Sequence, residues 1–204
     1  MIDYERALKS GLGLKVVERM SDRYQVYKVR GPEGLMVAKL SPRSPRQKRA
    51  SHYLDLEQEK NMLTRAHNPL FVPLILGIIR VPGLRGFYYG LSEFFLLPEG
   101  QATSKGNVDF YVLLRDYIQG NNLGEDKLLD QAQGRRFRET ISGLHLAGIC
   151  SFDLSPDNIR IERKTKIPYL VELAHCLTQE DLEDSQFEQA CVSDLEEVDR
   201  LCVA

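Results

Sequence analysis

The sequence contains no tryptophan, only four cysteines and no long apolar run. The cysteines, Cys150, Cys176, Cys191 and Cys202, form no C-x-x-C pair and have no zinc-like spacing with the four histidines. We therefore expect reduced, partly buried thiols and assign them no chemistry. The longest apolar stretch, residues 72–79, is far shorter than the roughly 20 residues that cross a bilayer. The N-terminus also lacks the apolar segment of a signal peptide, which predicts a cytoplasmic protein without a transmembrane segment.

A strong excess of charge of one sign is also missing. The 204 residues carry a formal net charge of −2 at pH 7, so electrostatics give no case for nucleic acid as the main partner. The charge is unevenly spread, because residues 175–204 hold nine acids and one base, which leaves +6 for residues 1–174. A basic run at residues 43–49 fits a solvated surface, with a site for an anionic group as the alternative.

The length allows one domain or two small lobes, and the pattern of the chain predicts an α+β fold. Alternating and β-branched runs predict a three-stranded meander, followed by a long helix and two more strands: residues 14–18, 25–29, 35–40, 45–66, 72–80 and 86–97. The second half is predicted to be mostly helical, with two short strands before the last helix: residues 107–118, 127–147, 158–162 and 168–172. Ser193 and Glu196 form a capping box, which predicts that the last helix begins at Ser193.

The most informative stretch is residues 144–161, which read L-H-L-A-G-I-C-S-F-D-L-S-P-D-N-I-R-I. A helix end, a turn and D-L-x-P-x-N before a β-branched strand resemble the catalytic loop of eukaryotic-like protein kinases. In that family the motif is H-R-D-L-x-x-x-N, in which Asp lies near the acceptor hydroxyl and Asn binds a metal ion. The resemblance implies these roles for Asp153 and Asn158.

Other elements match the kinase pattern in the same order. Met36-Val-Ala-Lys39-Leu resembles the strand whose lysine neutralises the α- and β-phosphates, and Glu59 stands where a helix glutamate pairs with that lysine. Tyr169-Leu-Val-Glu172-Leu-Ala stands where D-F-G is expected, so Glu172 replaces the metal-binding Asp. The resemblance implies a bilobal fold, with an N-lobe at residues 1–97, a linker at 98–106 and a C-lobe at 107–204.

The resemblance also implies ATP and Mg²⁺ or Mn²⁺ as cofactors, although the phosphate loop departs from the family. The three glycines of G-x-G-x-x-G are replaced by Arg19, Ser21 and Tyr24, so we expect Ser21 or Arg19 to contact phosphate with its side chain. The adenine is expected to contact the backbone near three residues of the predicted N-lobe: Ser92, Glu93 and Phe95. Ser151 and Phe152 replace the H-R dipeptide, and Ser155 replaces the lysine of protein-phosphorylating members.

Only thirty residues follow Ala174, so we expect a shortened C-lobe with no peptide-docking helices. Asp194 lies in the last helix and is expected to support the backbone of the catalytic loop. The layout is similar to minimal members such as lipopolysaccharide core kinases and the small kinase of the tRNA-modification complex. The resemblance therefore predicts an atypical kinase whose acceptor is a Ser/Thr side chain, a sugar or another small hydroxyl compound.

Two alternatives remain at this point. A pseudokinase would sense a nucleotide or act as a scaffold for a partner protein, and the missing glycines and the acidic C-terminal segment favour it. An unrelated α+β protein would use Asp153 and Asn158 only as turn residues.

Overall fold

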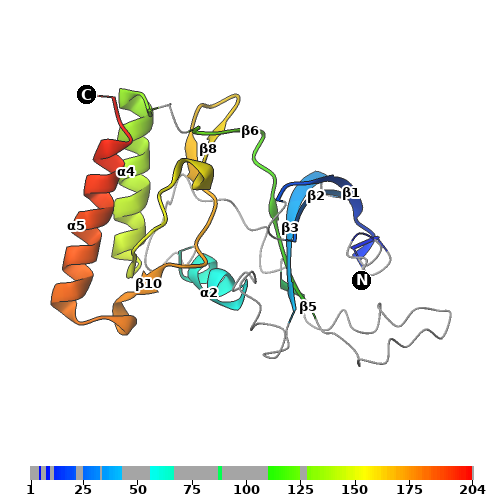
Figure 1. The fold of residues 1–204 in the computed structure, drawn as a ribbon, viewed down its shortest axis with the longest axis horizontal. Helices are drawn as coiled ribbons and strands as arrows, with labels where there is room; N and C mark the ends of the chain where they lie inside the picture. The colour runs from blue at the N-terminus through cyan, green and yellow to red at the C-terminus, as the bar shows by residue number, and fades with distance from the viewer. Residues whose placement is uncertain are drawn as a thin grey trace. The chain divides into compact units, whose positions relative to one another are not determined.

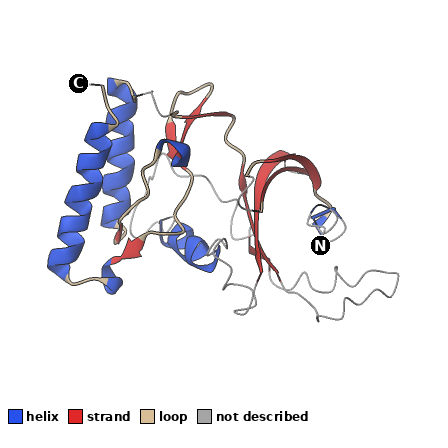
Figure 2. Ribbon diagram, viewed as in Figure 1, coloured by secondary structure: helices blue, strands red, loops and turns tan. Residues whose placement is uncertain are grey.

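The computed structural model describes residues 12–21, 25–32, 34–42, 56–66, 87–88, 110–124 and 128–203, together with residues 5, 8 and 9. The chain divides into two compact units, which Figures 1 and 2 show. The first unit contains residues 1–57 and 80–117, and the second contains residues 58–79 and 118–204. None of the described helices is long and apolar enough to cross a membrane.

The first unit contains an antiparallel sheet of five strands, in the order β1-β2-β3-β5-β4. The strands are β1 (Lys15–Arg19), β2 (Val26–Gly31), β3 (Gly34–Pro42), β4 (Phe87–Tyr88) and β5 (Phe110–Asp116). Short connections between consecutive β-branched runs favour hairpins, and β1, β2 and β3 follow one another in this way. The predicted three-stranded meander is therefore confirmed.

The helix predicted at residues 107–118 is wrong, because the structure places strand β5 there. Every residue of β5 pairs with β3, from Met36 opposite Asp116 to Pro42 opposite Phe110. A short apolar run is compatible with either a strand or a buried helix, and the free edge of β3 decides between them by offering hydrogen-bond partners. The chain enters the second unit immediately after Tyr117.

The two faces of this sheet differ in the side chains that they carry. One face contributes to an apolar cluster of fully or nearly fully buried residues: Leu8, Leu14, Tyr27, Val29, Met36, Ala38, Leu40, Val112 and Leu114. Side chains alternate along a strand, so Lys39 lies on the opposite face from Ala38 and Leu40. Lys39 is only 3% exposed there, and its register partners are Val26 and Leu113.

The second unit combines helices with two small sheets. The helices are α2 (Leu56–Ala66), which belongs to this unit from Gln58 onward, α4 (Gln131–Leu146) and α5 (Asp184–Arg200). One sheet has the order β6-β8-β9, with β6 (Gly120–Asn122), β8 (Ile159–Glu162) and β9 (Pro168–Leu170). The other pairs β7 (Ile149–Cys150) with β10 (Leu177–Thr178), and the 3₁₀ turns η2 (Pro156–Asn158) and η3 (Gln179–Asp181) complete the unit.

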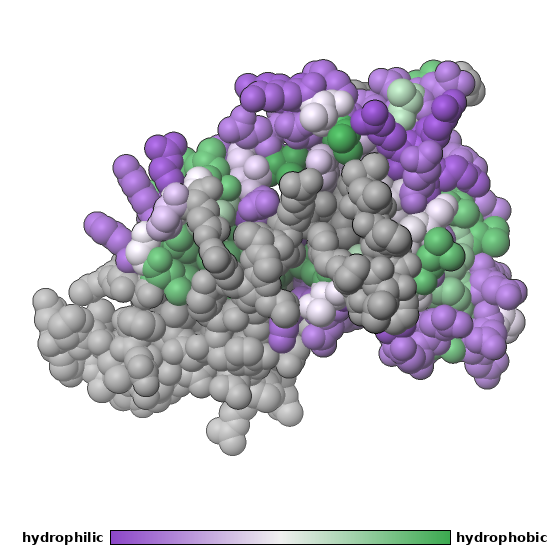
Figure 3. Space-filling view, turned by 180° about the vertical axis from the view of Figure 1, so that it is seen from behind, coloured by the Kyte–Doolittle hydropathy of each residue, from purple (hydrophilic) through white to green (hydrophobic). Residues whose placement is uncertain are grey.

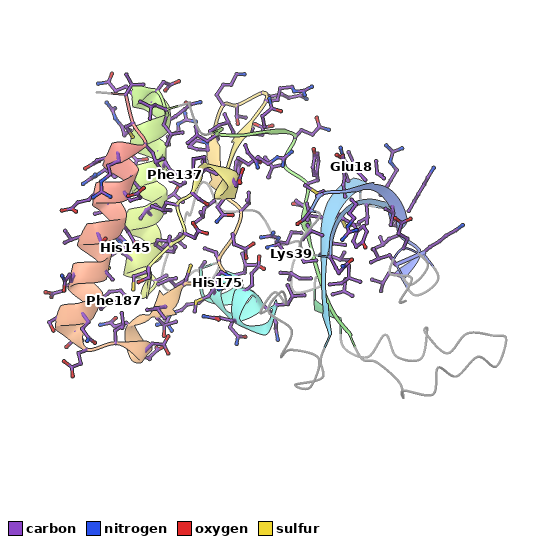
Figure 4. All side chains as sticks on the ribbon, viewed as in Figure 1. Glu18, Lys39, Phe137, His145, His175 and Phe187 are labelled. Carbon is purple, nitrogen blue, oxygen red and sulfur yellow. The ribbon has the colours of Figure 1, made fainter. Side chains whose placement is uncertain are left out.

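Helix α4 confirms the helix predicted at residues 127–147, although it begins later. Asp130 and Gln133 form a reciprocal capping box at its start, and Phe137, Ile141 and Leu144 are fully buried along one stripe. Figure 4 labels Phe137 and His145 on this helix.

The predicted start of the last helix at Ser193 is wrong, since α5 begins nine residues earlier at Asp184. Its capping box joins Glu183 and Gln186, where the Glu183 N–H donates to Gln186 Oε1 at 3.1 Å. The residues up to Val192 contain no glycine or proline, so the helix continues through the serine that the sequence pattern had suggested as its cap. The buried side includes Asp194 and Val198, and the outer residues are mostly acidic or polar.

Several predictions lie outside the described residues. These are the first part of the helix at residues 45–66, the strand at 72–80, most of the strand at 86–97 and the linker at 98–106. On the face that Figure 3 shows, hydrophilic side chains predominate over the described surface, with smaller hydrophobic areas between them.

Candidate active site

The loop between β7 and β8 contains the predicted catalytic-loop motif, residues 151–158. Gly148 precedes it with φ +71°, a left-handed conformation that glycine adopts without a steric penalty. Ser151 adopts φ 60° although it carries a Cβ, which costs about 1–2 kcal/mol for an L-residue. Pro156 begins the 3₁₀ turn η2, where its fixed φ and missing N–H are tolerated. A strained residue at the start of the loop must be stabilised by contacts from elsewhere.

Asp194 of α5 provides those contacts. Its Oδ2 accepts a hydrogen bond from the Ser151 N–H at 2.9 Å, and its Oδ1 accepts one from the Phe152 N–H at 3.1 Å. The residue is only 6% exposed, so both backbone groups find a charged acceptor in a nearly dry environment. The role predicted for Asp194, support of the catalytic-loop backbone, is confirmed by these two bonds.

His145 at the end of α4 completes this support, and the sequence did not reveal its role. Its Nε2 lies 3.0 Å from Asp194 Oδ2 and donates to it when the aspartate is ionised, because a carboxylate can only accept. The imidazole also stacks on Phe152, with ring centroids 5.7 Å apart. The sequence predicts a helix end at His145, but its partner Asp194 lies 49 residues further along the chain, so nothing near His145 in the sequence indicates the contact.

Hydrogen bonds link the segments that carry Asp153, Asn158 and Glu172. Asn158 Nδ2 donates to the Asp153 carbonyl at 3.1 Å, and the Asn158 carbonyl accepts from the Val171 N–H at 2.9 Å. Glu172 follows Val171 directly, and its Oε1 accepts from the Ala174 N–H at 3.3 Å. The three residues thus lie on segments that are linked by one side-chain and one backbone hydrogen bond.

The Asp153 carboxylate is exposed and makes one hydrogen bond within its own loop. Its Oδ1 accepts from the Ser155 N–H at 3.2 Å, and no described residue bonds its Oδ2. An exposed carboxylate oxygen on a fixed loop has the chemistry of a general base for an incoming hydroxyl group.

The donor set suits a hard divalent cation that is shared with a ligand. Among the described residues, no three His, Cys, Asp or Glu side chains gather to form a metal site. Asn158 and Glu172 offer one amide oxygen and one carboxylate, and the bond from Asn158 Nδ2 to Asp153 leaves the amide oxygen on the other side of the group. Mg²⁺ is typically held by one or two protein oxygens together with phosphates and waters, so this pair fits that ion.

The other predicted site residues are distributed over both units. Lys39 lies on β3 of the first unit, as Figure 4 shows, and Ser21 lies just after β1 and is half-buried. Glu59 lies on α2 in the second unit and is fully buried. Three predicted adenine contacts fall outside the described residues: Ser92, Glu93 and Phe95.

Helix α2, which carries Glu59, is attached within the second unit by two polar side chains that sequence reasoning missed. Gln58 Nε2 donates to the Cys176 carbonyl at 2.8 Å, and Arg65 Nε donates to the Ala147 carbonyl at 2.5 Å. Arg65 also pairs with Glu180 at 2.6 Å, and this hydrogen bond lowers the pKa of the glutamate. These bonds join α2 to the segments on either side of the catalytic loop.

The cysteines are all free thiols. Burial raises the pKa of Cys150 and Cys176, and it raises that of Cys191 to about 11. These thiols are therefore protonated at neutral pH and are weak nucleophiles.

Comparison with known proteins supports the fold. No model of a known protein family matches the sequence, and no curated protein matches it either. The structure matches 512 solved chains, among them a crystal structure of Rad53 in complex with AMP-PNP, with a TM-score of 0.51 and 17% sequence identity. The match covers 79% of this chain and 39% of the Rad53 chain. The protein has a mixed α+β, protein-kinase-like fold.

Proposed function

We propose that this protein is an atypical small kinase that transfers the γ-phosphoryl group of ATP to a hydroxyl acceptor. The observation that carries the proposal is the hydrogen bonding that links the segments of Asp153, Asn158 and Glu172 in the second unit: Asn158 Nδ2 donates to the Asp153 carbonyl, and the N–H of the residue before Glu172 donates to the Asn158 carbonyl. The kinase-like fold supports it, since the Rad53 structure with this fold holds the nucleotide AMP-PNP. The acceptor class that we propose includes Ser/Thr side chains, sugars and other small hydroxyl compounds.

In the proposed reaction, Asp153 accepts or steers the proton of the attacking hydroxyl group. Phosphoryl transfer needs little covalent help from the protein, and positioning together with charge neutralisation supplies most of the rate. The bond from the Ser155 N–H occupies one oxygen of the Asp153 carboxylate, which leaves the other for the acceptor.

We assign the nucleotide to the site residues that the kinase resemblance implies. Asn158 and Glu172 would hold Mg²⁺ or Mn²⁺, which supplies positive charge to the phosphates. Lys39 would neutralise the α- and β-phosphates, Glu59 would orient its ammonium group, and Ser21 would contact phosphate. The adenine contacts at Ser92, Glu93 and Phe95 remain a prediction from the sequence.

One observation favours a pseudokinase, which senses a nucleotide or serves as a scaffold, as the second candidate. Arg19 and Ser21 stand at the β1–β2 connection where the kinase pattern has glycines, and the Met20 N–H donates to the Val26 carbonyl at 2.8 Å. Side chains at these positions hinder close approach of backbone N–H groups to phosphate.

The test measures thermal stabilisation by ATP with Mg²⁺ or Mn²⁺, and transfer of radiolabelled phosphate to protein and sugar acceptors. The variant is Asp153→Asn, and the matched control is Asp157→Asn, an exposed residue of the same loop. We expect ATP to stabilise all three proteins. Transfer should fall by about 10²-fold or more in Asp153→Asn only, because a general base contributes on that order.

Each other result has a definite meaning. ATP stabilisation without transfer to any acceptor would favour the nucleotide-sensing pseudokinase. Absence of an ATP effect with either metal would contradict both nucleotide hypotheses and favour a scaffold.

A further inference from the structure

Arg160 on β8 makes hydrogen bonds that neither the kinase resemblance nor the proposed chemistry explains. Its Nε donates to the Ile118 carbonyl at 2.8 Å, and its Nη2 donates to the Gly120 carbonyl at 2.8 Å. Its Nη1 lies 3.4 Å from Asn122 Oδ1, and Asn122 is the register partner of Arg160. One guanidinium group therefore bonds every second residue of a single segment: Ile118, Gly120 and Asn122.

That segment, residues 118–122, is the first part of the second unit after the chain leaves β5. It is packed tightly against β8, because a Cβ on Gly120 would lie only 1.8 Å from the Ile161 carbonyl oxygen. Two backbone hydrogen bonds flank the contact. The Arg163 N–H donates to the Gln119 carbonyl at 2.7 Å, and the Leu123 N–H donates to the Ile159 carbonyl at 2.8 Å. No side chain other than hydrogen fits at Gly120 without moving the segment away.

Arginine is suited to this position in a way that lysine is not. Its planar fork presents several N–H donors at fixed angles, so it can bond two carbonyls of one segment at the same time. A lysine ammonium is a point charge with no such geometry and would reach one carbonyl only. The guanidinium group thus acts as a clamp on residues 118–122.

Strand β8 also connects this clamp to the catalytic loop. It begins at Ile159, directly after Asn158, so the candidate metal ligand and the clamp are two residues apart on one short, paired stretch. Residues 118–122 continue from β5, which pairs with the strand that carries Lys39. The backbone bonded by Arg160 is thus a covalent connection between the two sets of proposed nucleotide-binding residues.

We propose that Arg160 is a positioning residue that fixes residues 118–122 against β8, and that it acts on nucleotide affinity through Asn158, which directly precedes this strand. The second half of this inference rests on the proposed kinase function. A fixed β8 lowers the conformational entropy that Asn158 loses when the proposed metal–nucleotide complex binds. Arg160 bonds residues 118–122 and leaves the reacting atoms to Asp153, so its loss affects KM for ATP more than kcat.

The test uses the full chain with Arg160→Lys and Arg160→Met, and Arg163→Met as the matched control. Arg163 is an exposed arginine just beyond the same strand. The first readout is hydrogen exchange at the amides of Leu123 and Arg163, with the Leu129 amide as an internal reference, since it bonds Leu201 in another part of the unit. In the control variant, the amide at position 163 is followed in the same way.

We expect exchange at the two reporter amides to rise about tenfold in both Arg160 variants, because charge-assisted hydrogen bonds to a local segment are lost. The reference amide and the control variant should be unchanged. KM for ATP should rise several-fold, with a smaller change in kcat, and thermal stabilisation by ATP should fall in parallel.

Unchanged exchange in the Arg160 variants would overturn the clamp. Faster exchange with unaltered ATP affinity would overturn the link to nucleotide binding and leave a structural clamp only. If the wild-type protein binds no ATP, the proposed function and the nucleotide half of the inference fail together, whereas the exchange result still decides the clamp by itself.

Discussion

The sheet of the first unit and the catalytic loop of the second are stabilised by different kinds of interaction. The sheet is held by continuous backbone ladders between neighbouring strands and by an apolar cluster on one face. The catalytic loop, residues 151–158, is held mainly by polar side chains: Asp194 bonds the Ser151 and Phe152 N–H groups, His145 bonds Asp194, and Asn158 bonds the Asp153 carbonyl. One substitution in the sheet should therefore remove only a small share of the contacts that hold it. One substitution in the loop should remove most of the hydrogen bonds that hold the loop.

The largest expected effect on stability is in the sheet. Leu40→Ala removes a side chain that is 2% exposed, and we expect the free energy of unfolding to fall by about 3 kcal/mol through lost burial and a residual cavity. Urea denaturation measures the loss, and hydrogen exchange locates it. The comparison predicts faster exchange in β2, β3 and β5 with little change at Ser151 and Phe152. Equal acceleration in the catalytic loop would show that the two regions do not respond separately.

Asp194→Asn should produce the next largest effect, and it should be confined to the loop. An amide replaces one of the two acceptor oxygens with a donor that faces an N–H group, so we expect a loss of about 2 kcal/mol. Exchange at the Ser151 and Phe152 amides should increase, and phosphate transfer should decrease. Asp199→Asn on the exposed side of the same helix is the control. A similar loss in both variants would contradict a specific role for Asp194.

Substitutions at the strained start of the loop should change the free energy of unfolding less, and in opposite directions at Ser151 and Gly148. Ser151→Gly relieves the strain of a φ of 60°. Glycine also gives the unfolded chain more entropy, which offsets part of this gain, so we expect a net stabilisation of about 0.5 kcal/mol. Gly148→Ala introduces the same strain at φ +71° and also places a Cβ 2.8 Å from Arg65 Nη2, so it should destabilise by about 1 kcal/mol or more. Thermal unfolding of both variants checks the pair. Destabilisation by Ser151→Gly would mean that the serine side chain contributes more than its strained backbone removes.

The ion pair of Arg65 and Glu180 should have the smallest effect, and it should depend on pH. The hydrogen bond from Arg65 lowers the pKa of Glu180 below its ordinary value of 4.5. The stabilisation is therefore complete above that value and is lost as the pH falls through the lower value of the folded protein. Wild type and Glu180→Gln should differ slightly in unfolding free energy at pH 7 and converge in acid. A difference that grows in acid would contradict this assignment.

Part of the fold could be predicted because the signals are local. The meander of β1, β2 and β3 follows from alternating runs separated by short turns, and α4 follows from the stripe of Phe137, Ile141 and Leu144. Strand β5 could not be distinguished from a helix, because its apolar run fits both until the edge of β3 is known. The start of α5 was placed too late, since a good capping sequence within a helix is not used when the preceding residues also favour helix.

The candidate site was predicted in the same uneven way. Asp153, Asn158 and Glu172 were predicted because their order and spacing match one family pattern, and their roles remain predictions. The support predicted for Asp194 is confirmed by its two bonds to the loop. Arg65, His145 and Arg160 were missed, because nothing near them in the sequence indicates their partners. The linker near residues 98–106 and the adenine contacts remain predictions from the sequence.

The sequence alone determined the order of the predicted site residues, through its match to one family pattern. It also determined the hairpins of the first unit and the amphipathic face of α4, since these two features depend on residues within a few turns or neighbouring strands of each other. Tertiary structure alone decided that residues 110–116 form a strand, that His145 and Asp194 jointly hold the strained loop, and that Arg160 clamps residues 118–122. The physical reason is that these features consist of hydrogen bonds between groups 40 to 80 residues apart, whose energies exist only once the chain has folded.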